Sequence, residues 1–289
     1  MSEAPAFERH RGRLLGLAYR MLGSRADAED AVQDAWLRWS QTDQRSVNSA
    51  EAYLVTIVTR LCLDRMKSAR AQREIYVGPW LPEPVADAEA LSPHNATELA
   101  DDLSFALLLA LERLSPLERA AFLLHDVFDE PFAQVAAALD RSEAAVRQLA
   151  ARARRTVRDE RPRQRADRQS HERLLAAFTQ ALASRDAEAL KAVLREDALA
   201  VTDGGGRKIA ALNPIFGADK VVRFFLGLMR KHEANGVALN VAATQINGGP
   251  GLLIYLDGAL DQALTIESDG ERIVALYAVR NPDKLTALH

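Results

Sequence analysis

The segment 131–158 constrains the fold of this chain more than any other stretch, because its pattern predicts two helices joined by a tight break. The apolar residues of the first helix recur at helical spacing: Phe132, Val135, Ala136 and Leu139. Asp140 and Arg141 interrupt that spacing. Ser142 and Glu143 then provide an N-cap residue and a first-turn acid for a second helix. The segment therefore predicts a helix-turn-helix.

The second helix of this segment has an apolar side and a basic side. The apolar side holds Ala145, Val146, Leu149 and Ala153, and the residues mostly off it are Arg147, Gln148, Arg152, Arg154, Arg155 and Arg158. A DNA-recognition helix needs this division. We expect Arg147 and Gln148 to read base edges, and Arg152, Arg154 and Arg155 to contact phosphates. An exposed basic helix without a DNA partner is the alternative.

The overall charge does not argue against DNA binding. The 289 residues carry a formal net charge of −3, and acidic residues concentrate at 83–89 and 98–102, away from the basic helix. Nucleic-acid binding depends on the local patch rather than on the total. The length indicates two or three domains.

Cysteine usage and hydropathy predict a cytoplasmic protein. Cys62 is the single cysteine and lies in an apolar run, which favours a core residue over a redox sensor. The N-terminal residues lack the apolar run of a signal peptide. No run of about 18 apolar residues predicts a membrane span. We expect no metal and no cofactor.

The first 75 residues predict three helices. The apolar stripe of the first ends at Gly23 and Ser24, and the second begins near Asp27. The second helix has apolar positions Ala28, Ala31, Val32, Ala35, Trp36 and Trp39. A polar loop at 41–49 precedes a third helix that begins at Ala50 and ends in a basic stretch.

Residues 76–97 predict a linker, because four prolines exclude a regular helix. Tyr76, Trp80 and Leu81 stand among these prolines, which is unusual for a flexible spacer. A stiff apolar segment of this kind predicts docking onto a surface. A merely extended spacer is the alternative.

The remainder divides into a helical segment, 98–160, and a mixed segment, 168–289. The mixed segment begins with helices and then alternates strand patterns with glycine turns. The predicted strands are Ala198–Thr202, Val237–Ile246, Leu252–Asp257, Ala259–Glu267 and Arg272–Val279. We expect a multidomain chain, with a helical bundle and a helix-turn-helix, both all-α, followed by an α+β domain whose helices cover one face of an antiparallel sheet.

Several motifs resemble the extracytoplasmic-function sigma factors of bacterial RNA polymerase, specifically the SigJ-like group with a C-terminal SnoaL-like extension. They are AEDAVQDAWLRW at 28–39, YVGPWLPEP at 76–84, ALERLSPLERAAFLLHDVFDEPFAQVAAALDRSEAAVRQLAARARR at 110–155, DGGGRK at 203–208 and NPDKL at 281–285. Arg207 stands where the group's pattern has lysine, and Lys208 follows it. The resemblance makes 1–75 sigma domain 2, 98–160 sigma domain 4 and 168–289 a SnoaL-like regulatory domain of NTF2-like cone shape.

The resemblance implies roles for the N-terminal helices. The second helix would bind the large subunits of the RNA polymerase core through Asp30, Val32, Gln33, Asp34 and Leu37. The loop and third helix would bind and melt the −10 element through Asn48, Arg60, Asp64, Arg65, Lys67, Arg70 and Arg73. The helix-turn-helix would recognise the −35 element of promoter DNA.

The resemblance also implies regulation in cis without a separate anti-sigma factor. The expected regulatory contacts are Tyr76, Trp80, Leu81, Asp203, Gly204, Gly205, Gly206, Lys208, Asn281, Pro282, Asp283 and an exposed Lys284. Since some SnoaL-like domains are enzymes, Asp203, Asp257 and His232 are candidate catalytic groups, although no convergent constellation is visible. An unknown small ligand without chemistry is a further possibility. The alternative to the whole scheme is a ligand-sensing helix-turn-helix regulator.

Overall fold

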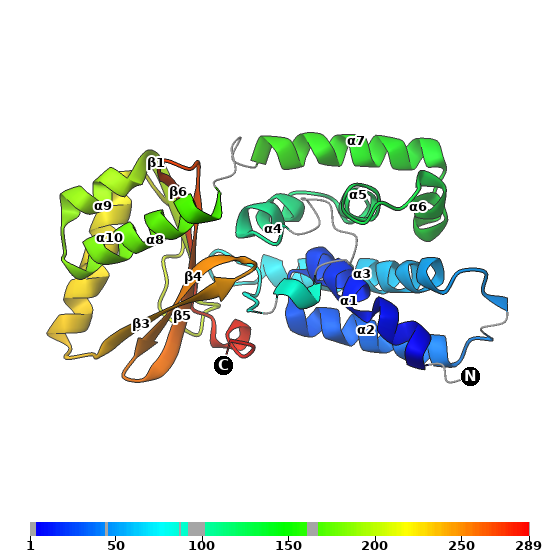
Figure 1. The fold of residues 1–289 in the computed structure, drawn as a ribbon, viewed down its shortest axis with the longest axis horizontal. Helices are drawn as coiled ribbons and strands as arrows, with labels where there is room; N and C mark the ends of the chain where they lie inside the picture. Colours follow the sequence, from blue (N-terminus) through cyan, green and yellow to red (C-terminus); the bar gives the residue numbers. More distant parts are fainter. Residues whose placement is uncertain (1–3, 44–45, 87, 92–101, 161–166, 289) are drawn as a thin grey trace. The chain divides into compact units, whose positions relative to one another are not determined.

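The computed structural model describes residues 4–43, 46–86, 88–91, 102–160 and 167–288, which form two compact units (Figure 1). Unit 1 contains Met1–Glu74 and Asp87–Arg161. Unit 2 contains Ile75–Ala86 and Pro162–His289, so the linker segment folds with the C-terminal part of the chain. No helix in the described ranges is long and apolar enough to cross a bilayer.

The N-terminal half of unit 1 is a bundle of three helices. They are α1 (Ala4–Leu22), α2 (Arg25–Ser40) and α3 (Ala50–Glu74), followed by the short 3₁₀-helix η2 (Ala88–Leu91). The Ser24 hydroxyl accepts the Asp27 N–H and caps α2, as expected for a helix start at this point. The apolar stripes of α1 and α2, including Trp39, are buried in the bundle.

The second half of unit 1 contains the predicted helix-turn-helix. Helices α4 (Phe105–Glu112) and α5 (Pro116–Phe122) lead through the π-helical turn η3 (Leu123–Val127) to α6 (Phe132–Leu139) and α7 (Glu143–Glu160). Asp140 adopts a left-handed conformation, with φ of 53°, and ends α6. The Ser142 hydroxyl accepts the Ala145 N–H at the start of α7. The predicted break and cap are therefore both present.

Two arginines, Arg119 and Arg13, join the two halves of unit 1, and Arg119 is fully buried. Arg119 is 2% exposed and donates to the Met21 carbonyl at the end of α1, at 2.7 Å. Arg13 of α1 donates to the Phe128 carbonyl at 2.6 Å and to the Glu130 carboxylate at 2.8 Å. Because a buried guanidinium without acceptors is costly, these bonds tie α1 firmly to the segments around α5 and η3.

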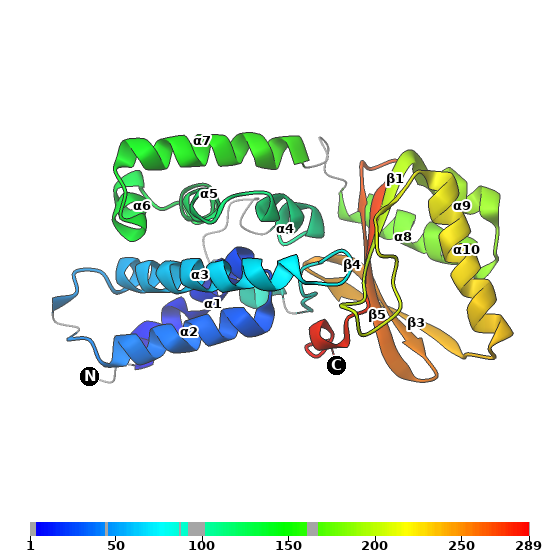
Figure 2. The same ribbon diagram turned by 180° about the vertical axis from the view of Figure 1, so that it is seen from behind.

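Unit 2 is an α+β domain in which three helices cover one face of a six-stranded sheet (Figures 1 and 2). The helices are α8 (Arg168–Ala183), α9 (Ala187–Val193) and α10 (Ala218–Ala234). The strands are β1 (Leu194–Asp203), β2 (Ile215–Phe216), β3 (Leu239–Ile246), β4 (Gly249–Leu256), β5 (Ala259–Ser268) and β6 (Ile273–Val279), in the order β2-β1-β6-β5-β4-β3.

The sheet is mixed, which corrects the expectation of a purely antiparallel one. Strands β1 and β6 pair in parallel, and the other neighbouring strands pair antiparallel. The α+β class itself is confirmed. The parallel pair brings the C-terminal ends of β1 and β6 together, with Asp203 opposite Val279. The DGGGRK turn that begins at Asp203 and the NPDKL segment that follows β6 therefore meet at one end of these two strands.

Candidate functional sites

The recognition helix α7 presents its basic residues to solvent. Arg147, Gln148, Arg152, Arg154 and Arg155 are all exposed, whereas the apolar side is buried. The Arg147 guanidinium pairs with Glu143 at 3.0 Å, and its carbon lies 4.3 Å from the centre of the Phe132 ring. These contacts hold the side chain near the start of α7, where recognition helices read base edges.

Two of the expected phosphate-binding arginines are ion-paired in the free protein. Arg152 contacts Glu118 at 2.8 Å and Arg154 contacts Asp126 at 2.6 Å. Both arginine side chains are about half exposed. Because ion pairs at the surface are worth at most about 1 kcal/mol, phosphates can replace these carboxylates at little cost.

The polar side of α2 contacts a basic residue of α3. Arg65 donates to Asp34 at 2.7 Å and lies 3.8 Å from Asp30, so one expected DNA-binding residue pairs with two expected polymerase-binding acids. Gln33 and Leu37 are exposed beside them, Leu37 at 51%. Val32 is only 3% exposed. It packs in the bundle core, which corrects the prediction that it lies on the contact surface of α2.

The expected base-capture residues of α3 have different environments. Asn48 is exposed, and Asp64 and Lys67 form an exposed ion pair at 2.8 Å. Arg60 instead donates to the Ala138 and Ala137 carbonyls at the C-terminus of α6, each at 3.1 Å. Its guanidinium is thus directed at the helix-turn-helix. The side chains of Arg70 and Arg73 lie outside the described residues.

Asp203, the last residue of β1, is the centre of the linker-binding site in unit 2. It is fully buried, and its carboxylate accepts hydrogen bonds from the Tyr76 hydroxyl at 2.6 Å and the Leu81 N–H at 2.9 Å. It also accepts from the Lys284 ammonium at 2.7 Å and the Gly205 N–H at 3.0 Å. One carboxylate therefore connects the linker, the DGGGRK turn and the NPDKL segment.

Lys284 is enclosed by the linker rather than exposed, which corrects the sequence expectation. Its side chain is 12% exposed, and its ammonium also donates to the Leu81 carbonyl at 2.5 Å. The ammonium lies 4.3 Å from the centre of the Trp80 ring and 4.9 Å from that of Tyr76. An aromatic ring face stabilises a desolvated cation. The prolines keep the linker backbone out of a helix, and in this conformation the two rings contact Lys284.

The NPDKL segment forms a second set of contacts through Asn281. This residue is buried and donates to the Tyr76 hydroxyl at 2.9 Å. Gly205 has a φ of +57°, and a side chain there would overlap the Asn281 amide and the Tyr76 hydroxyl. Only glycine satisfies both requirements. Gly204 is buried beside it, whereas Gly206, Pro282 and Asp283 lie toward solvent.

The linker is also held at its far end by the β3–β4 turn. The Val85 N–H donates to the Asn247 side-chain oxygen at 3.0 Å, and the Asn247 N–H donates to the Val85 carbonyl at 2.7 Å. Residues 81–85 are all buried. Asn247 adopts a left-handed conformation, which suits asparagine in a tight hairpin turn. Sequence reasoning placed Asn247 in a turn but did not identify it as a linker contact.

The two cations of the DGGGRK turn have separate partners. Arg207 pairs with the exposed Asp283 at 3.0 Å. Lys208 pairs with the buried Asp261 of β5 at 3.2 Å, and Asp261 also accepts a bidentate pair from Arg280. Sequence reasoning missed Asp261 and Arg280. The available signal was an acid near the start of one predicted strand and a base directly after the end of the next.

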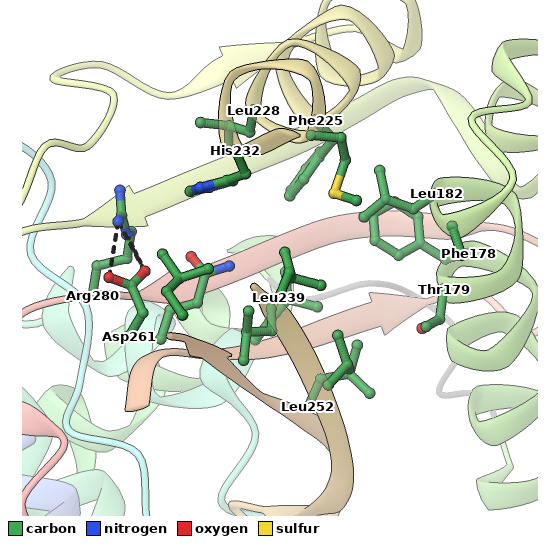
Figure 3. A pocket seen from close by; sticks show the side chains of 17 residues that line it. Phe178, Thr179, Leu182, Phe225, Leu228, His232, Leu239, Leu252, Asp261 and Arg280 are labelled. Carbon is green, nitrogen blue, oxygen red and sulfur yellow. Dashed lines mark hydrogen bonds and ion pairs between the residues drawn. The ribbon is translucent and has the colours of Figure 1, made fainter. Parts of the chain in front are cut away.

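A pocket lies between the sheet and helices α8 and α10 (Figure 3). His232, Asp261 and Arg280 stand at one end, and mostly apolar side chains line the rest, together with Thr179 and Gln262. Of the three candidate catalytic groups, only His232 lines this pocket. Asp203 binds the linker. Asp257 lies in the β4–β5 hairpin turn, where its carboxylate accepts the N–H of Ala238, the residue before β3.

The shifted pKa values of Cys62 and Tyr76 bear on the roles expected of these residues. Burial raises the pKa of the Cys62 thiol to about 12, which leaves essentially no thiolate at neutral pH. This agrees with a core cysteine. Burial and the hydrogen bond to Asp203 raise the pKa of the Tyr76 hydroxyl, so it remains a donor to that carboxylate.

Comparison with known proteins decides the family. Residues 6–72 match the family described as Sigma-70 region 2, and residues 104–157 match Sigma-70, region 4. The chain is 40% identical to the ECF RNA polymerase sigma factor SigJ of Mycobacterium tuberculosis, over 98% of this chain and 93% of the relative. The chain belongs to the extracytoplasmic-function sigma factors. Among known structures, the crystal structure of that SigJ superposes with a TM-score of 0.75 at 37% identity, and the match covers 97% of each chain.

A second relative supports this assignment of a sigma factor. The probable ECF RNA polymerase sigma factor SigI of Mycobacterium tuberculosis is 30% identical over 98% of this chain and 94% of the relative. The region 2 match covers most of α1 to α3, and the region 4 match covers α4 to most of α7. Membership of the family excludes the alternative of an unrelated ligand-sensing regulator, because both sigma regions are present in order.

Proposed function

We propose that this sigma factor directs initiation at its promoters under restraint by its own C-terminal domain, which binds the linker between regions 2 and 4. The exposed face of α2 contacts the polymerase core, α3 and its preceding loop engage the −10 element, and α7 reads the −35 element. The domain acts by binding and without catalytic turnover. No separate anti-sigma factor is then required for the restraint.

The observation that carries this proposal is the membership of Ile75–Ala86 in unit 2. This segment connects the last helix of region 2 with the first part of region 4. Leu81, Val85 and Tyr76 bond to the domain, and Lys284 closes over the rings of the linker. A linker fixed in this way cannot extend freely when regions 2 and 4 spread over a promoter.

Covalent attachment makes a modest interface sufficient for restraint. The linker and its binding site belong to one chain, so their encounter is intramolecular at an effective concentration of roughly millimolar or more. The polymerase must compete with this contact. The pairing of Arg60 with the carbonyls of α6 adds to the restraint, because that arginine reaches DNA only after α6 has moved away.

Transcription in vitro with purified polymerase core tests the proposal. The full-length chain is compared with a chain lacking 281–289 and with Lys284→Glu, which places a second negative charge beside buried Asp203. Both changes should raise promoter-specific transcription, because they release the linker. Lys220→Glu, on the exposed start of α10, is the matched control and should behave like the wild type.

A larger deletion, from residue 168 onward, should give less transcription than the short deletion. It leaves the apolar side chains of Trp80, Leu81 and Val85 without their binding surface. Failure of both the full-length chain and the short deletion to bind core or to support any transcription would refute the roles given to regions 2 and 4. Unchanged transcription with both the short deletion and Lys284→Glu, in folded protein, would refute the restraint.

A further inference from the structure

We propose that the pocket in the C-terminal domain binds a small amphipathic carboxylic acid, with its apolar body against the helices and its carboxylate at Arg280. The pocket has a volume of about 90 Å³ and lies beside a groove of about 610 Å³ along α8 and β3. Thr179, Ala183, Val241 and Leu252 line both. An elongated molecule therefore has room beyond the pocket itself.

The apolar end of the pocket determines the body of the ligand. Phe178 and Leu182 of α8 and Phe225 of α10 face Leu252 of β4 across the space (Figure 3). Aromatic and branched side chains around a preformed cavity bind an aryl ring or a branched alkyl chain by excluding water.

The polar end of the pocket determines the head group. Asp261 and Arg280 are largely buried and pair at 2.8 Å, and Lys208 pairs with the same carboxylate from outside the pocket. The two cations and one anion leave a local charge of +1. His232 adds a nitrogen donor or acceptor on the other side (Figure 3). A carboxylate balances this charge, whereas an amine adds to it and an alcohol leaves it unchanged.

The polar end of the pocket is directly connected to the linker-binding site through the backbone, because Arg280 of the pocket precedes Asn281 of the linker-binding site. The backbone N–H groups of Arg280 and Asn281 both donate to the Asp203 carbonyl, at 2.7 and 2.9 Å. Lys208 ends the turn that begins at Asp203. An acid that draws Arg280 or Lys208 away from Asp261 therefore acts on the two segments that hold Tyr76 and Leu81. This coupling rests on the proposed restraint, although binding of the acid does not.

Calorimetry on the full-length chain tests the binding site with three probes that share one apolar body. Phenylpropionate should bind at least about tenfold more tightly than phenylpropanol, because a charge-assisted hydrogen bond is lost with the alcohol. Phenylpropylamine should bind more weakly than the alcohol. Equal affinities for acid and alcohol, or no binding of the acid at millimolar concentration, would overturn the proposal.

Variants locate the site within the domain. Leu228→Trp fills the pocket and should abolish binding of phenylpropionate. Arg280→Gln should weaken it at least about tenfold, whereas Arg223→Gln, the same change on the exposed face of α10, should leave it unchanged. Thermal unfolding verifies that each variant is folded. If Arg280→Gln does not fold, the comparison of the three probes on the wild type still tests whether the pocket prefers a carboxylate.

Hydrogen exchange in residues 76–86 tests the coupling separately. Saturating phenylpropionate should change the exchange rate of the Val85 amide, while phenylpropylamine should not. An unchanged rate at saturation would refute the coupling. Since neither calorimetry nor exchange involves polymerase, a failure here is distinguishable from a failure of the proposed restraint.

Discussion

Replacing Asp203 with asparagine tests whether one buried carboxylate holds the linker on the C-terminal domain. The change preserves the shape of the side chain but removes its charge. Lys284 and the Leu81 N–H both donate to one oxygen of Asp203, and the Tyr76 hydroxyl and the Gly205 N–H donate to the other. With the asparagine NH2 group toward Lys284 and the Leu81 N–H, two hydrogen bonds are lost. In the other orientation the Gly205 N–H loses its acceptor and the Tyr76 hydroxyl must turn to accept instead of donate, and in both orientations the charge opposite Lys284 is gone.

The contacts of Asp203 set the size of the effect. Lys284 is enclosed, and loss of one partner of a buried ion pair costs about 3–5 kcal/mol. Its remaining 12% exposure and its contacts with two aromatic rings moderate this penalty. We therefore expect the bound state of the linker to lose about 3 kcal/mol, which corresponds to a factor of about 100 in the equilibrium for its release.

Hydrogen exchange at Val85 measures this release. The Val85 N–H bonds to Asn247 and not to Asp203, so it exchanges faster only if the linker leaves its site. Asp203→Asn should accelerate its exchange about 100-fold, while amides of the β4–β5 hairpin remain protected. Asp283→Asn is the matched control, because its ion pair with Arg207 is exposed and predicts at most about a fivefold change. Equal exchange in the two variants would refute the reasoning.

Three further predictions concern unit 1. Arg147→Ala should relax the base preference at one position of the −35 element, whereas Lys67→Ala should weaken binding to matched and mismatched promoters alike; equal losses on both promoters for Arg147→Ala would remove it from the base-reading residues. Ser115→Ala should cost about 1 kcal/mol of unfolding free energy at neutral pH, because the hydroxyl caps α5 and its hydrogen bond lowers the pKa of Glu118. A lowered pKa stabilises the fold above the ordinary value of 4.5, and this contribution is lost as the pH falls through the lowered pKa, so thermal unfolding in acid should show a smaller effect of Ser115→Ala; an undiminished effect would contradict this. Cys62 should react with a thiol reagent at about pH 8 only after denaturation, because its pKa is about 12, and rapid labelling of folded protein would contradict its burial.

Features set by neighbouring residues could be predicted from the sequence. The starts of α2 and α7 follow from Ser24 and Ser142, whose hydroxyls accept N–H groups three residues along the chain. The break at Asp140 and the hairpin turns at Asn247 and Asp257 follow from residues that tolerate positive φ. Each of these features depends on a few adjacent side chains, so a local pattern contains the necessary information.

Features that depend on distant partners could not be predicted in the same way. The parallel pairing of β1 with β6 joins strands that are far apart in the sequence, and no strand pattern specifies it. Arg60 carries the same charge whether it faces DNA or the carbonyls of α6. Asp261 and Arg280 were overlooked because an acid within a strand normally lies on the solvent face. Lys284 is predicted to lie in solvent, because lysine is rarely buried without a partner and its partner Asp203 is 81 residues away in the sequence.

The residues that contact each other in the linker-binding site are synthesised at different times, because they lie far apart in the sequence. Lys284 and Leu81 are 203 residues apart, and Asp203 and Tyr76 are 127 apart. At roughly 5–20 residues per second of synthesis, the linker emerges from the ribosome about 10–40 s before the lysine that encloses it. Regions 2 and 4 thus emerge in full before the contacts of the proposed restraint can form. Under the proposed restraint, each newly made chain therefore passes through an interval, set by the rate of translation, in which its linker is not yet bound by the C-terminal domain.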